Sequence, residues 1–214
     1  MLDLAATPLV LTGREVTLQP LELEHAEALA LAAAESREHF RWNPVPDGVV
    51  DARQYIERAI RARAAGDRLP FVIRFRSRVV GTTSYSDYQP WEWPAGSPEQ
   101  RTDRPDALEI GYTWLAASAQ RTRCNTEAKF LLLAHAFEHW QVHRVSLRTD
   151  ERNQRSRRAI TRLGATFEGI RRGDKPGADG ALRHSAFYSI LRGEWPAVRE
   201  HLQALLEHEV ADAS

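Results

Sequence analysis

The sequence predicts a single α+β domain, a three-layer arrangement in which helices flank a mixed, mostly antiparallel central sheet of about seven strands. Its 214 residues are the size of one domain. Its 43 % hydrophobic and 27 % charged residues are typical of a globular chain rather than a disordered one. The apolar patterning gives the order β α α β β β α β α β β α, with no internal repeat and no Gly/Ser linker. We therefore expect one domain over 1–214, with a core at about 11–192 and a C-terminal helix at about 194–208.

The N-terminal half begins with a strand, because apolar Val16 and Leu18 alternate with polar neighbours. A segment rich in Ala, Leu and Glu follows and is typical of a helix. The expected segments are a strand over 11–20, helices over 21–36 and 51–66, strands over 69–75 and 78–85, and a polar, Pro- and Trp-rich insertion over 88–105. Insertions of that length in a compact domain are usually functional or disordered.

The C-terminal half contains the strongest helix pattern, over 126–140, whose apolar residues cover most of the circumference. Such a helix is expected to be buried against a sheet. The other expected segments are a strand over 107–116, a polar loop over 118–125, a strand over 143–150, a helix over 153–163, strands over 165–172 and 183–191 joined by a turn at 175–180, and a final helix over 194–208.

Composition excludes several classes of function. The 29 basic residues balance 29 acidic ones, which argues against a general nucleic-acid coat protein. The cations are almost all Arg, a skew to which we give no functional weight. A single cysteine allows no internal disulfide and no multi-cysteine metal site. No apolar run approaches the ~20 residues of a membrane span, and no basic region precedes the N-terminal apolar stretch. We expect a cytoplasmic protein that binds neither nucleic acid nor membrane.

Several catalytic signatures are missing, namely a phosphate loop ending in GK[ST], GxGxxG, GxSxG and HExxH. His135 and His139 lie four apart on one helical face, with His143 close behind. No carboxylate stands at metal-ligand spacing on that face, so we expect these histidines to pack rather than to hold a metal. Cys124 is expected to be incidental, since no His is near it in sequence.

The most informative stretch is LEIGYTWLAASAQRTRCNTEAK, residues 108–129, in which a strand runs through a polar turn into a helix. The free N–H groups and partial positive charge of a helix N-terminus suit a phosphate. Asn125 or Thr126 is expected to cap this helix. Taken alone, the pattern fits a plain capped helix equally well. A second stretch, TDERNQRSRRAITRLGATF at 149–167, starts a short helix with Asn153 and Ser156 and ends it in LGA before a strand.

Together these two stretches resemble the GCN5-related N-acetyltransferase (GNAT) superfamily, and within it the branch that includes ribosomal-protein N-terminal acetyltransferases. The EIGY, NTEAK and NxRS elements and the final YSIL…EWP carry the resemblance, which extends from Leu11 to about Leu206. It implies the GNAT fold, in which splayed central strands form a cleft for acyl-CoA. The implied co-substrate is acetyl-CoA or another acyl-CoA.

The resemblance also implies which residues bind the cofactor. The backbone of the loop and helix start would cradle the pyrophosphate, the strand before it would pair with the pantetheine arm, and the next helix would contact the cofactor from the other side. The residues of the loop and helix start are Gln120, Arg121, Thr122, Arg123, Cys124, Asn125 and Thr126. Those of the strand are Trp114, Leu115 and Ala116, and those of the next helix are Asn153 and Arg158.

Two positions of this loop depart from the family's Q/R-x-x-G-x-G/A pattern. Arg123 occupies the usual glycine slot and Asn125 the Gly/Ala slot. Arginine adopts positive φ less cheaply than glycine. The loop therefore either differs locally, or Arg123 adds a charge-assisted phosphate contact.

The implied reaction is direct transfer of the acyl group to an amine. Ile160 stands where many members carry a tyrosine general acid, which leaves Ser156 to protonate the departing thiolate, as in the ribosomal-protein branch. The alternative is that Ser156 only supports the first helical turn. Glu109 is the first candidate for the base that takes the amine proton, and Asp87 the second. Either carboxylate is otherwise a surface or salt-bridged group. A backbone N–H on the strand of Glu109 is expected to polarise the acyl oxygen.

Aromatic residues around the insertion are candidates for an acceptor pocket. They are Tyr85, Tyr88, Trp91, Trp93 and Trp114, with Trp42 from the helical region. We expect Trp42, Tyr85, Asp87 and Trp91 to contact the acceptor. The same rings are equally consistent with packing of the loop, and a homodimer contact is a third interpretation.

Charge is also divided along the chain. Residues 152–183 contain nine basic and three acidic residues, whereas residues 21–60 contain eight acidic and four basic ones. The basic part coincides with the expected cofactor side. The acidic part coincides with the first helices, which are expected to recognise the acceptor and would favour a cationic amine.

We therefore expect an acyl-CoA-dependent N-acyltransferase, with acetyl as the first choice of acyl group. The acceptor is the primary amine of a protein N-terminus or of a small molecule. One alternative is an acyl-CoA-binding or interaction module that keeps the fold but has little or no activity. A weaker one is an oligomeric scaffold without a ligand.

Overall fold

The computed structural model describes residues 8–100 and 103–211. Its centre is a mixed sheet of eight strands in the order β1-β2-β3-β4-β5-β6-β8-β7. Neighbouring strands are antiparallel except β5 and β6, which are parallel. Residues 1–7, 101–102 and 212–214 lie outside the description, and with them parts of the predicted domain, of the insertion and of the N-terminal apolar stretch.

The strand order along the chain agrees with the prediction, with one strand more than expected. The strands are β1 (Leu11–Thr12), β2 (Val16–Pro20), β3 (Arg68–Phe75), β4 (Arg78–Gln89), β5 (Ala107–Leu115), β6 (Arg144–Asp150), β7 (Thr166–Pro176) and β8 (Leu182–Leu191). The extra strand arises because the predicted first strand folds back on itself, with Gly13 N–H donating to Val16 O at 2.8 Å.

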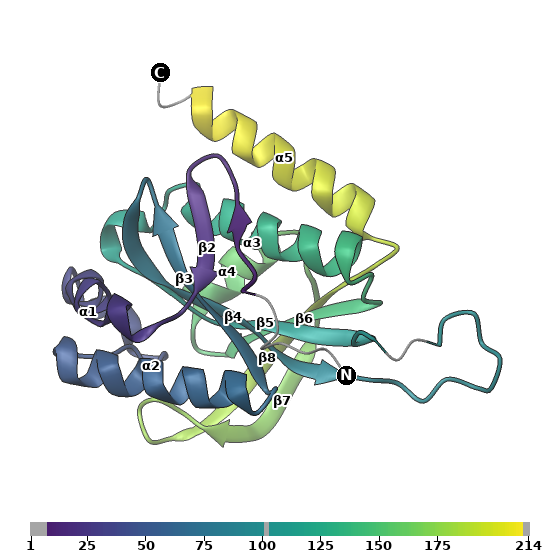
Figure 1. Ribbon diagram of the computed structural model, residues 1–214, viewed down its shortest axis with the longest axis horizontal. Coiled ribbons are helices and arrows are strands. Elements are labelled where there is room, and N and C mark those ends of the chain that lie inside the picture. Colours follow the sequence, from purple (N-terminus) through teal and green to yellow (C-terminus); the bar gives the residue numbers. More distant parts are fainter. Residues whose placement is uncertain (1–7, 101–102, 212–214) are drawn as a thin grey trace.

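Helices cover both faces of the sheet. They are α1 (Ala26–Ala34), α2 (Gly48–Ala64), α3 (Cys124–Ala134), α4 (Gln154–Arg162) and α5 (Trp195–Ala211), with short turns at Leu23–His25, Glu38–Phe40, Ala117–Ala119 and His135–His139. α1 and α2 pack on β3 and β4, whereas α3 packs on β1, β2 and α5 (Figure 1). The predicted three-layer α+β architecture is confirmed. No helix in the described ranges is both long and apolar enough to cross a bilayer.

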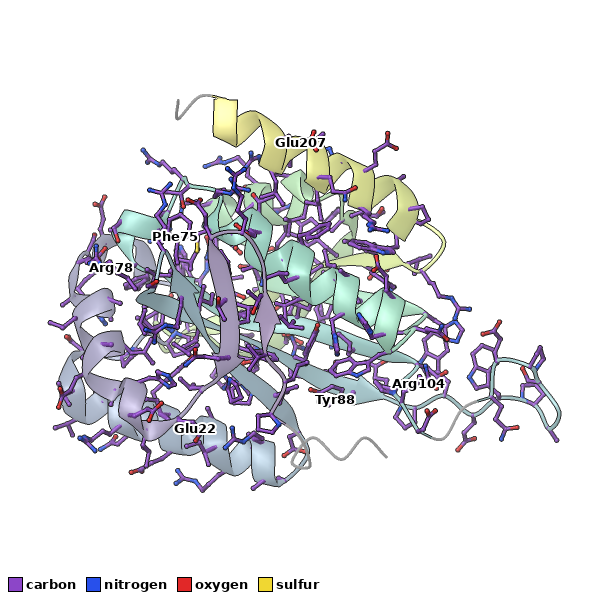
Figure 2. All side chains as sticks on the ribbon, turned by 45° about the horizontal axis from the view of Figure 1, so that its top comes forward. Glu22, Phe75, Arg78, Tyr88, Arg104 and Glu207 are labelled. Atoms are coloured by element: carbon purple, nitrogen blue, oxygen red, sulfur yellow. The ribbon has the colours of Figure 1, made fainter. Side chains whose placement is uncertain are left out.

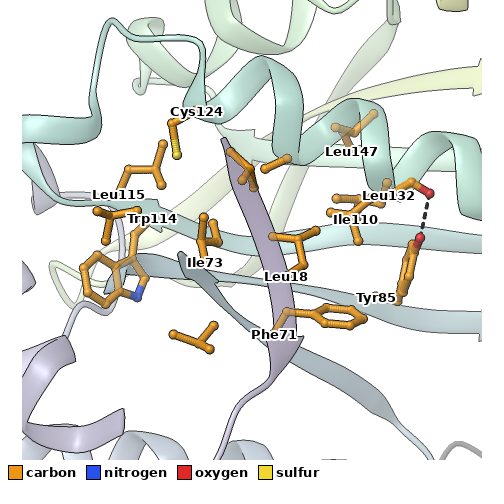
Figure 3. Packing of buried hydrophobic residues seen from close by; sticks show 14 of the residues in the cluster. Leu18, Phe71, Ile73, Tyr85, Ile110, Trp114, Leu115, Cys124, Leu132 and Leu147 are labelled. Atoms are coloured by element: carbon orange, nitrogen blue, oxygen red, sulfur yellow. Dashed lines mark hydrogen bonds between the residues drawn. The ribbon is translucent and has the colours of Figure 1, made fainter. Parts of the chain in front are cut away.

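The core extends over both faces of the sheet, and one part of it lies between the sheet and α3. Leu18, Phe71 and Leu132 are fully buried in it. The hydroxyl of Tyr85 donates to the Leu132 carbonyl at 2.6 Å, which ties β4 to α3 (Figure 3). The predicted burial of the helix over 126–140 against the sheet is thus confirmed.

The parallel pair β5–β6 is short, and this shapes the molecule. Only residues 107–109 of β5 pair with residues 144–146 of β6. Beyond that point β5 pairs only with β4, and β6 only with β8. The sheet therefore forks after Glu109, as the resemblance implied.

A bulge in β5 lies just inside the fork. Thr82 faces Trp114 and Ser84 faces Gly111, so β5 carries one residue more than β4 in this interval. Tyr112, at φ 52°, lies in the bulge. A side chain on Gly81 would collide with the Trp114 carbonyl, so close approach of β4 to the bulge requires glycine there.

The insertion between β4 and β5 is fastened at its base. The carboxylate of Asp106 accepts hydrogen bonds from the Trp91 amide (2.7 Å) and from Trp93 Nε1 (2.8 Å). The ring of His143 stacks on Trp91 at 5.4 Å. Figure 2 shows the insertion extending away from the sheet, with Arg104 near the place where it returns. Packing of the loop accounts for Trp91 and Trp93.

Candidate active site

A cavity of about 840 Å³ occupies the fork. Its walls come from β5, the first turns of α3 and α4, β6, the hairpin of β7 and β8, and the segment 40–44 before α2. Twelve predicted site residues line it: Trp42, Glu109, Trp114, Leu115, Gln120, Arg121, Thr122, Asn125, Thr126, Asn153, Ser156 and Arg158. The structure thus brings together residues that are more than a hundred positions apart in the chain.

Three predicted acceptor contacts lie outside the lining of this cavity. Tyr85 is fully buried beneath α3, with its hydroxyl committed to Leu132 O, so it has no surface to offer a ligand. Asp87 accepts a hydrogen bond from Gln89 Nε2 at 3.2 Å on the exposed end of β4. Trp91 belongs to the base of the insertion. The alternation of side chains along β4 explains Tyr85, which points to the α3 side while its neighbours Thr82 and Ser84 point elsewhere.

Two residues that were predicted to contact the cofactor are buried in the core instead. Ala116 is buried, and its amide donates to Val80 O at 2.7 Å. Cys124 is buried too, and burial, then Glu127 and Glu15, raises the pKa of its thiol to about 12. Cys124 therefore stays a protonated thiol near neutral pH, in agreement with the expectation that it is not a nucleophile.

Arg123 is turned away from the cavity. Its φ is −60°, and its Nε lies 3.5 Å from a carboxylate oxygen of Glu15 and 3.4 Å from one of Glu127. The expected strain in the glycine slot therefore does not arise there, and Arg123 lies outside the cavity lining with its guanidinium between two carboxylates. The positive φ of this loop falls at Arg121, at 60°.

The first turn of α3 presents unclaimed donors. The helix has no side-chain cap, so the prediction that Asn125 or Thr126 caps it is wrong. Instead Thr122 Oγ1 accepts from the Cys124 amide (3.2 Å) and starts the helix two residues earlier. Within the described ranges the amides of Asn125 and Thr126 have no acceptor. Trp114 adds an indole Nε1–H that is buried and has no hydrogen-bond partner among the residues that the structure describes.

The first turn of α4 is capped by Asn153, whose Oδ1 accepts from the Ser156 amide at 3.0 Å. The Oδ1 atom of Asn153 is thus used to cap α4. Ser156 supports the turn through its backbone, while its side chain belongs to the cavity wall. The two interpretations of Ser156 are therefore compatible with each other.

Three arginines stand around this end of the cavity, namely Arg121, Arg155 and Arg158. In the part of the chain that is described, none of them has a carboxylate within 4.0 Å. Desolvation, and then the charge of Arg121, lowers the pKa of Arg155. Uncompensated cations beside unclaimed helix amides form a site for an anion.

Glu109 stands where the fork opens, and is 4 % exposed. Burial raises the pKa of its carboxyl, while Arg148 opposes the shift as the next largest cause. Arg148 Nε lies 2.7 Å from Glu109 Oε2. The expected alternative of a salt-bridged carboxylate is therefore present, in a group that also lines the cavity.

Sequence reasoning missed Lys129, which is buried in the cavity wall. Its Nζ donates to Thr113 Oγ1 in the bulge (2.6 Å) and to Thr83 Oγ1 (3.3 Å). Burial lowers the pKa of Lys129 to about 7, with Glu109 opposing the shift. The signal was visible in the sequence as a lone lysine in an otherwise apolar helix segment. The other missed lining residues include Tyr55, Arg148, Arg155, Lys175 and Arg183.

The histidines of the predicted packing cluster do pack. His135 stacks on His139 at 5.0 Å and meets Trp140 edge-on at 4.7 Å. Burial, then His139, lowers the pKa of His135 to about 4. Among the described residues no group of three or more His, Cys, Asp or Glu side chains could hold a metal ion.

Comparison with known families decides the assignment. Residues 15–166 match the acetyltransferase (GNAT) domain model. The chain belongs to the GNAT family. The matched range contains the fork, the bulge and the starts of α3 and α4, so the GNAT features predicted from the sequence and those in the structure coincide.

Solved GNAT structures resemble the whole chain. A GCN5-related N-acetyltransferase from Brucella melitensis is 26 % identical, covers 92 % of this chain and 84 % of its own, and superposes with a TM-score of 0.77. A candidate acetyltransferase from T. thermophilus is 34 % identical over 94 % of this chain and 98 % of its own, with a TM-score of 0.76. No curated protein matched the sequence.

The ribosomal-protein branch is represented at the level of the fold. Mycobacterium smegmatis RimJ, solved in complex with CoA-disulfide, is 23 % identical over 93 % of both chains, with a TM-score of 0.72. RimL, a ribosomal L7/L12 α-N-protein acetyltransferase, is 16 % identical over 87 % of this chain and 96 % of its own, with a TM-score of 0.71.

Lys129 predicts a pH dependence of stability. The unfolded chain keeps the lysine proton up to its ordinary pKa of 10.5, whereas the native state releases it near pH 7. The native state is therefore penalised most below pH 7, and stability gains as the pH rises from 7 toward 10. Lys129→Met should remove this gain and raise the free energy of unfolding most at low pH. Urea unfolding of both proteins from pH 6 to 10 measures it, and equal slopes against pH would show that the lysine is not neutralised by folding.

Proposed function

We propose that this protein is an acyl-CoA-dependent N-acyltransferase that moves an acyl group, acetyl in the first instance, from coenzyme A directly to a primary amine. The observation that carries the proposal is the cavity at the fork. It joins an anion site built on the first turns of α3 and α4 to a buried carboxylate, Glu109, on the diverging edge of β5.

The residues present fit an acyl-CoA. Its phosphates are anionic groups that need N–H donors and cations, and the amides of Asn125 and Thr126 and the arginines Arg121, Arg155 and Arg158 supply them. The inner edge of β5 beyond Glu109 has no strand partner and can pair with an extended amide-bearing arm. The Leu115 carbonyl is the exception, since Gln120 Nε2 already donates to it at 2.8 Å.

Two relatives in fold support this choice of ligand. The RimJ structure contains a CoA-disulfide, and the microcin C7 self-immunity acetyltransferase MccE was solved with acetyl-CoA and AMP. Both are below 25 % identity, so they support the fold that holds such a ligand.

The bound co-substrate supplies the acyl group as a thioester. A new C–N bond forms between the acceptor nitrogen and the acyl carbon, and the C–S bond breaks. Glu109 accepts the proton that the amine gives up, since burial makes its carboxylate a better base than an exposed one. Ser156 donates a proton to the departing sulfur and regains one from solvent. A backbone N–H of β5, the strand of Glu109, is proposed to stabilise negative charge on the acyl oxygen.

Several parts of the proposal go beyond the family assignment. The acceptor is the amine of a protein N-terminus or a small molecule, contacted by Trp42 from the cavity wall. A cytoplasmic location is part of the proposal, in keeping with a buried, unpaired Cys124. A homodimer stays a prediction.

Release of free thiol from acetyl-CoA and succinyl-CoA, measured over a panel of primary amines, tests this function. We expect amine-dependent release with at least one pair of substrates. Ser156→Ala should slow release by roughly tenfold or more while the Kd for acyl-CoA changes less than about threefold. Thr161→Ala, on the exposed side of the same helix, is the matched control and should behave like wild type.

The outcomes separate the hypotheses. Binding of acyl-CoA without amine-dependent thiol release would favour a non-catalytic binding module. Absence of acyl-CoA binding by calorimetry would exclude both it and the enzyme.

Glu109 predicts the shape of the pH–rate profile. A base acts only when deprotonated, so the wild-type rate should fall as the pH drops through the raised pKa of Glu109. Glu109→Gln should lower kcat by roughly 10²-fold and remove this acid limb. Asp87→Asn, at the second candidate base outside the cavity lining, should keep the acid limb but move it to lower pH, because the charge of Asp87 contributes to the raised pKa of Glu109. An acid limb that persists in Glu109→Gln would assign the base elsewhere.

A further inference from the structure

The acidic residues of the first helices do not form the acceptor side of the cavity. Eight acidic residues lie within 21–60, yet the lining residues from this part of the chain are Phe40, Trp42, Asn43, Pro44 and Tyr55. Some of the carboxylates are used elsewhere: Glu22 pairs with Arg63 at 2.7 Å, and Glu35 accepts from the Ser118 amide at 2.7 Å. The expected attraction for a cationic acceptor is therefore absent from the cavity wall.

Cations take that place beside Glu109. Arg148 of β6, Lys175 of β7 and Arg183 of β8 all line the cavity. Lys175 and Arg183 are direct partners in the β7–β8 register, so their side chains leave the hairpin together. Arg148 and Arg183 both lower the pKa of Lys175, after desolvation as the largest cause, while Glu109 opposes the shift. These groups therefore share one neighbourhood.

The carboxylates nearby are already engaged. Glu109 pairs with Arg148 at 2.7 Å. Asp174 accepts from Ser185 Oγ at 2.7 Å and lies 3.4 Å from Arg171 Nη1.

Lys175 and Arg183 are the cavity cations that these carboxylates do not contact directly. In the described part of the chain neither has a carboxylate within 4.0 Å. Lys175 stands at the exposed rim and Arg183 is partly buried, with its Nε held by Ser185 Oγ at 2.9 Å. Two positive charges thus face the cavity with no carboxylate in direct contact among the described residues, while Asp150, Asp174 and Glu109 act on them from farther away.

The hairpin that carries these cations is fixed in place. Arg152, in the turn between β6 and α4, bridges Asp150 of β6 (2.7 Å) and Asp179 of the hairpin turn (2.9 Å). Trp42 covers the Arg152 guanidinium at 4.0 Å from its ring centre. The end of β6, the hairpin turn and the segment before α2 thus meet at Arg152, which holds the hairpin that carries the cation pair.

A second anion site is distinct from the one proposed for the phosphates of acyl-CoA. The first is built by Arg121, Arg155 and Arg158 on the starts of α3 and α4. The charge of Arg121 acts on Arg155, whereas the charges that act on Lys175 and Arg183 are those of Arg148, Glu109 and Asp174, with Asp150 also acting on Arg183. The pKa shifts of the cations at each site are thus caused by charges at that same site.

We propose that the acceptor is an amine that carries an oxyanion, a carboxylate or a phosphate, in the same molecule, and that Lys175 and Arg183 bind this group while Glu109 faces the amine. The inference rests on the proposed function and narrows its acceptor class. A pair of cations beside a base holds such a molecule by its anionic end and orients its nitrogen toward the acyl group.

Matched pairs of probes test this proposal. Phosphoethanolamine is compared with ethanolamine, and β-alanine with β-alaninamide, in thiol release from acetyl-CoA. We expect kcat/KM to be at least about tenfold higher for the anionic member of one pair, and which pair responds tells phosphate from carboxylate. Lys175→Met and Arg183→Met should each lower that value about tenfold and lower the value for the member without the anionic group much less, so that the preference within the pair is lost. Lys175→Arg should keep most of the preference, and Arg61→Met on the exposed side of α2 is the control.

Equal or better use of both neutral members would overturn the proposal, while the acyltransferase function would stand. A loss of acetyl-CoA affinity of about tenfold in the Lys175→Met, Arg183→Met double variant would also overturn it, since the cations would then serve the donor.

A binding measurement distinguishes failure of this anion-site proposal from failure of the proposed acyltransferase function. Calorimetry of the same four probes and inorganic phosphate with the acetyl-CoA-loaded protein needs no turnover. Binding of an anionic probe that is lost in the double variant supports the site even in an inactive protein, and no anion binding at all overturns it.

Discussion

The parallel pairing of β5 with β6 ends after three residues, and the rest of the site depends on that limit. Backbone N–H and C=O groups that leave a sheet must find other partners or a ligand. Here residues 110–115 of β5 keep β4 on one edge and open the other to the cavity. The chain therefore places an unpaired strand edge, two helix N-termini and a buried carboxylate around one space.

Two side-chain networks hold the β5 bulge from opposite faces. On one face Tyr55 of α2 shares a hydrogen bond with Thr82 (2.8 Å), and Thr82 donates to the Tyr112 carbonyl (3.2 Å). On the other, Lys129 of α3 donates to Thr113. Burial of a lysine costs free energy, because its charged amine loses contact with water. The hydrogen bond to Thr113 gives Lys129 a structural role at the bulge that an apolar side chain could not fill. The helices on both faces thus fix the strand geometry on which the proposed chemistry depends.

Much of the fold was predictable, because period-two and helical patterning persist through each element. Boundaries shifted where a side chain changed a local hydrogen bond, as at Thr122, which starts α3 at Cys124 rather than at Thr126. The additional strand came from the turn at Gly13. The order of elements, the fork and most of the cofactor-side lining followed from the sequence and its resemblance to the GNAT family.

The acceptor side was not predictable in the same way. Tyr85 and Trp42 both looked like aromatic candidates, and only the face of β4 and the path of the 40–44 segment separated them. Linear charge counts placed an acidic patch where the folded cavity has cations, since the helix carboxylates point elsewhere. The chain's two lysines, Lys129 and Lys175, both line the cavity. In this Arg-rich chain, the two positions that carry lysine instead of arginine are thus both positions in the cavity wall.

The central claim is that the fork between β5 and β6 receives acyl-CoA. Hydrogen–deuterium exchange with and without acetyl-CoA tests it directly, because it reports on the backbone amides themselves. We expect slower exchange at residues 110–115 of β5 and in the first turn of α3, with no change in the insertion at 88–100. Protection confined to other elements, or none at saturating acetyl-CoA, would contradict it.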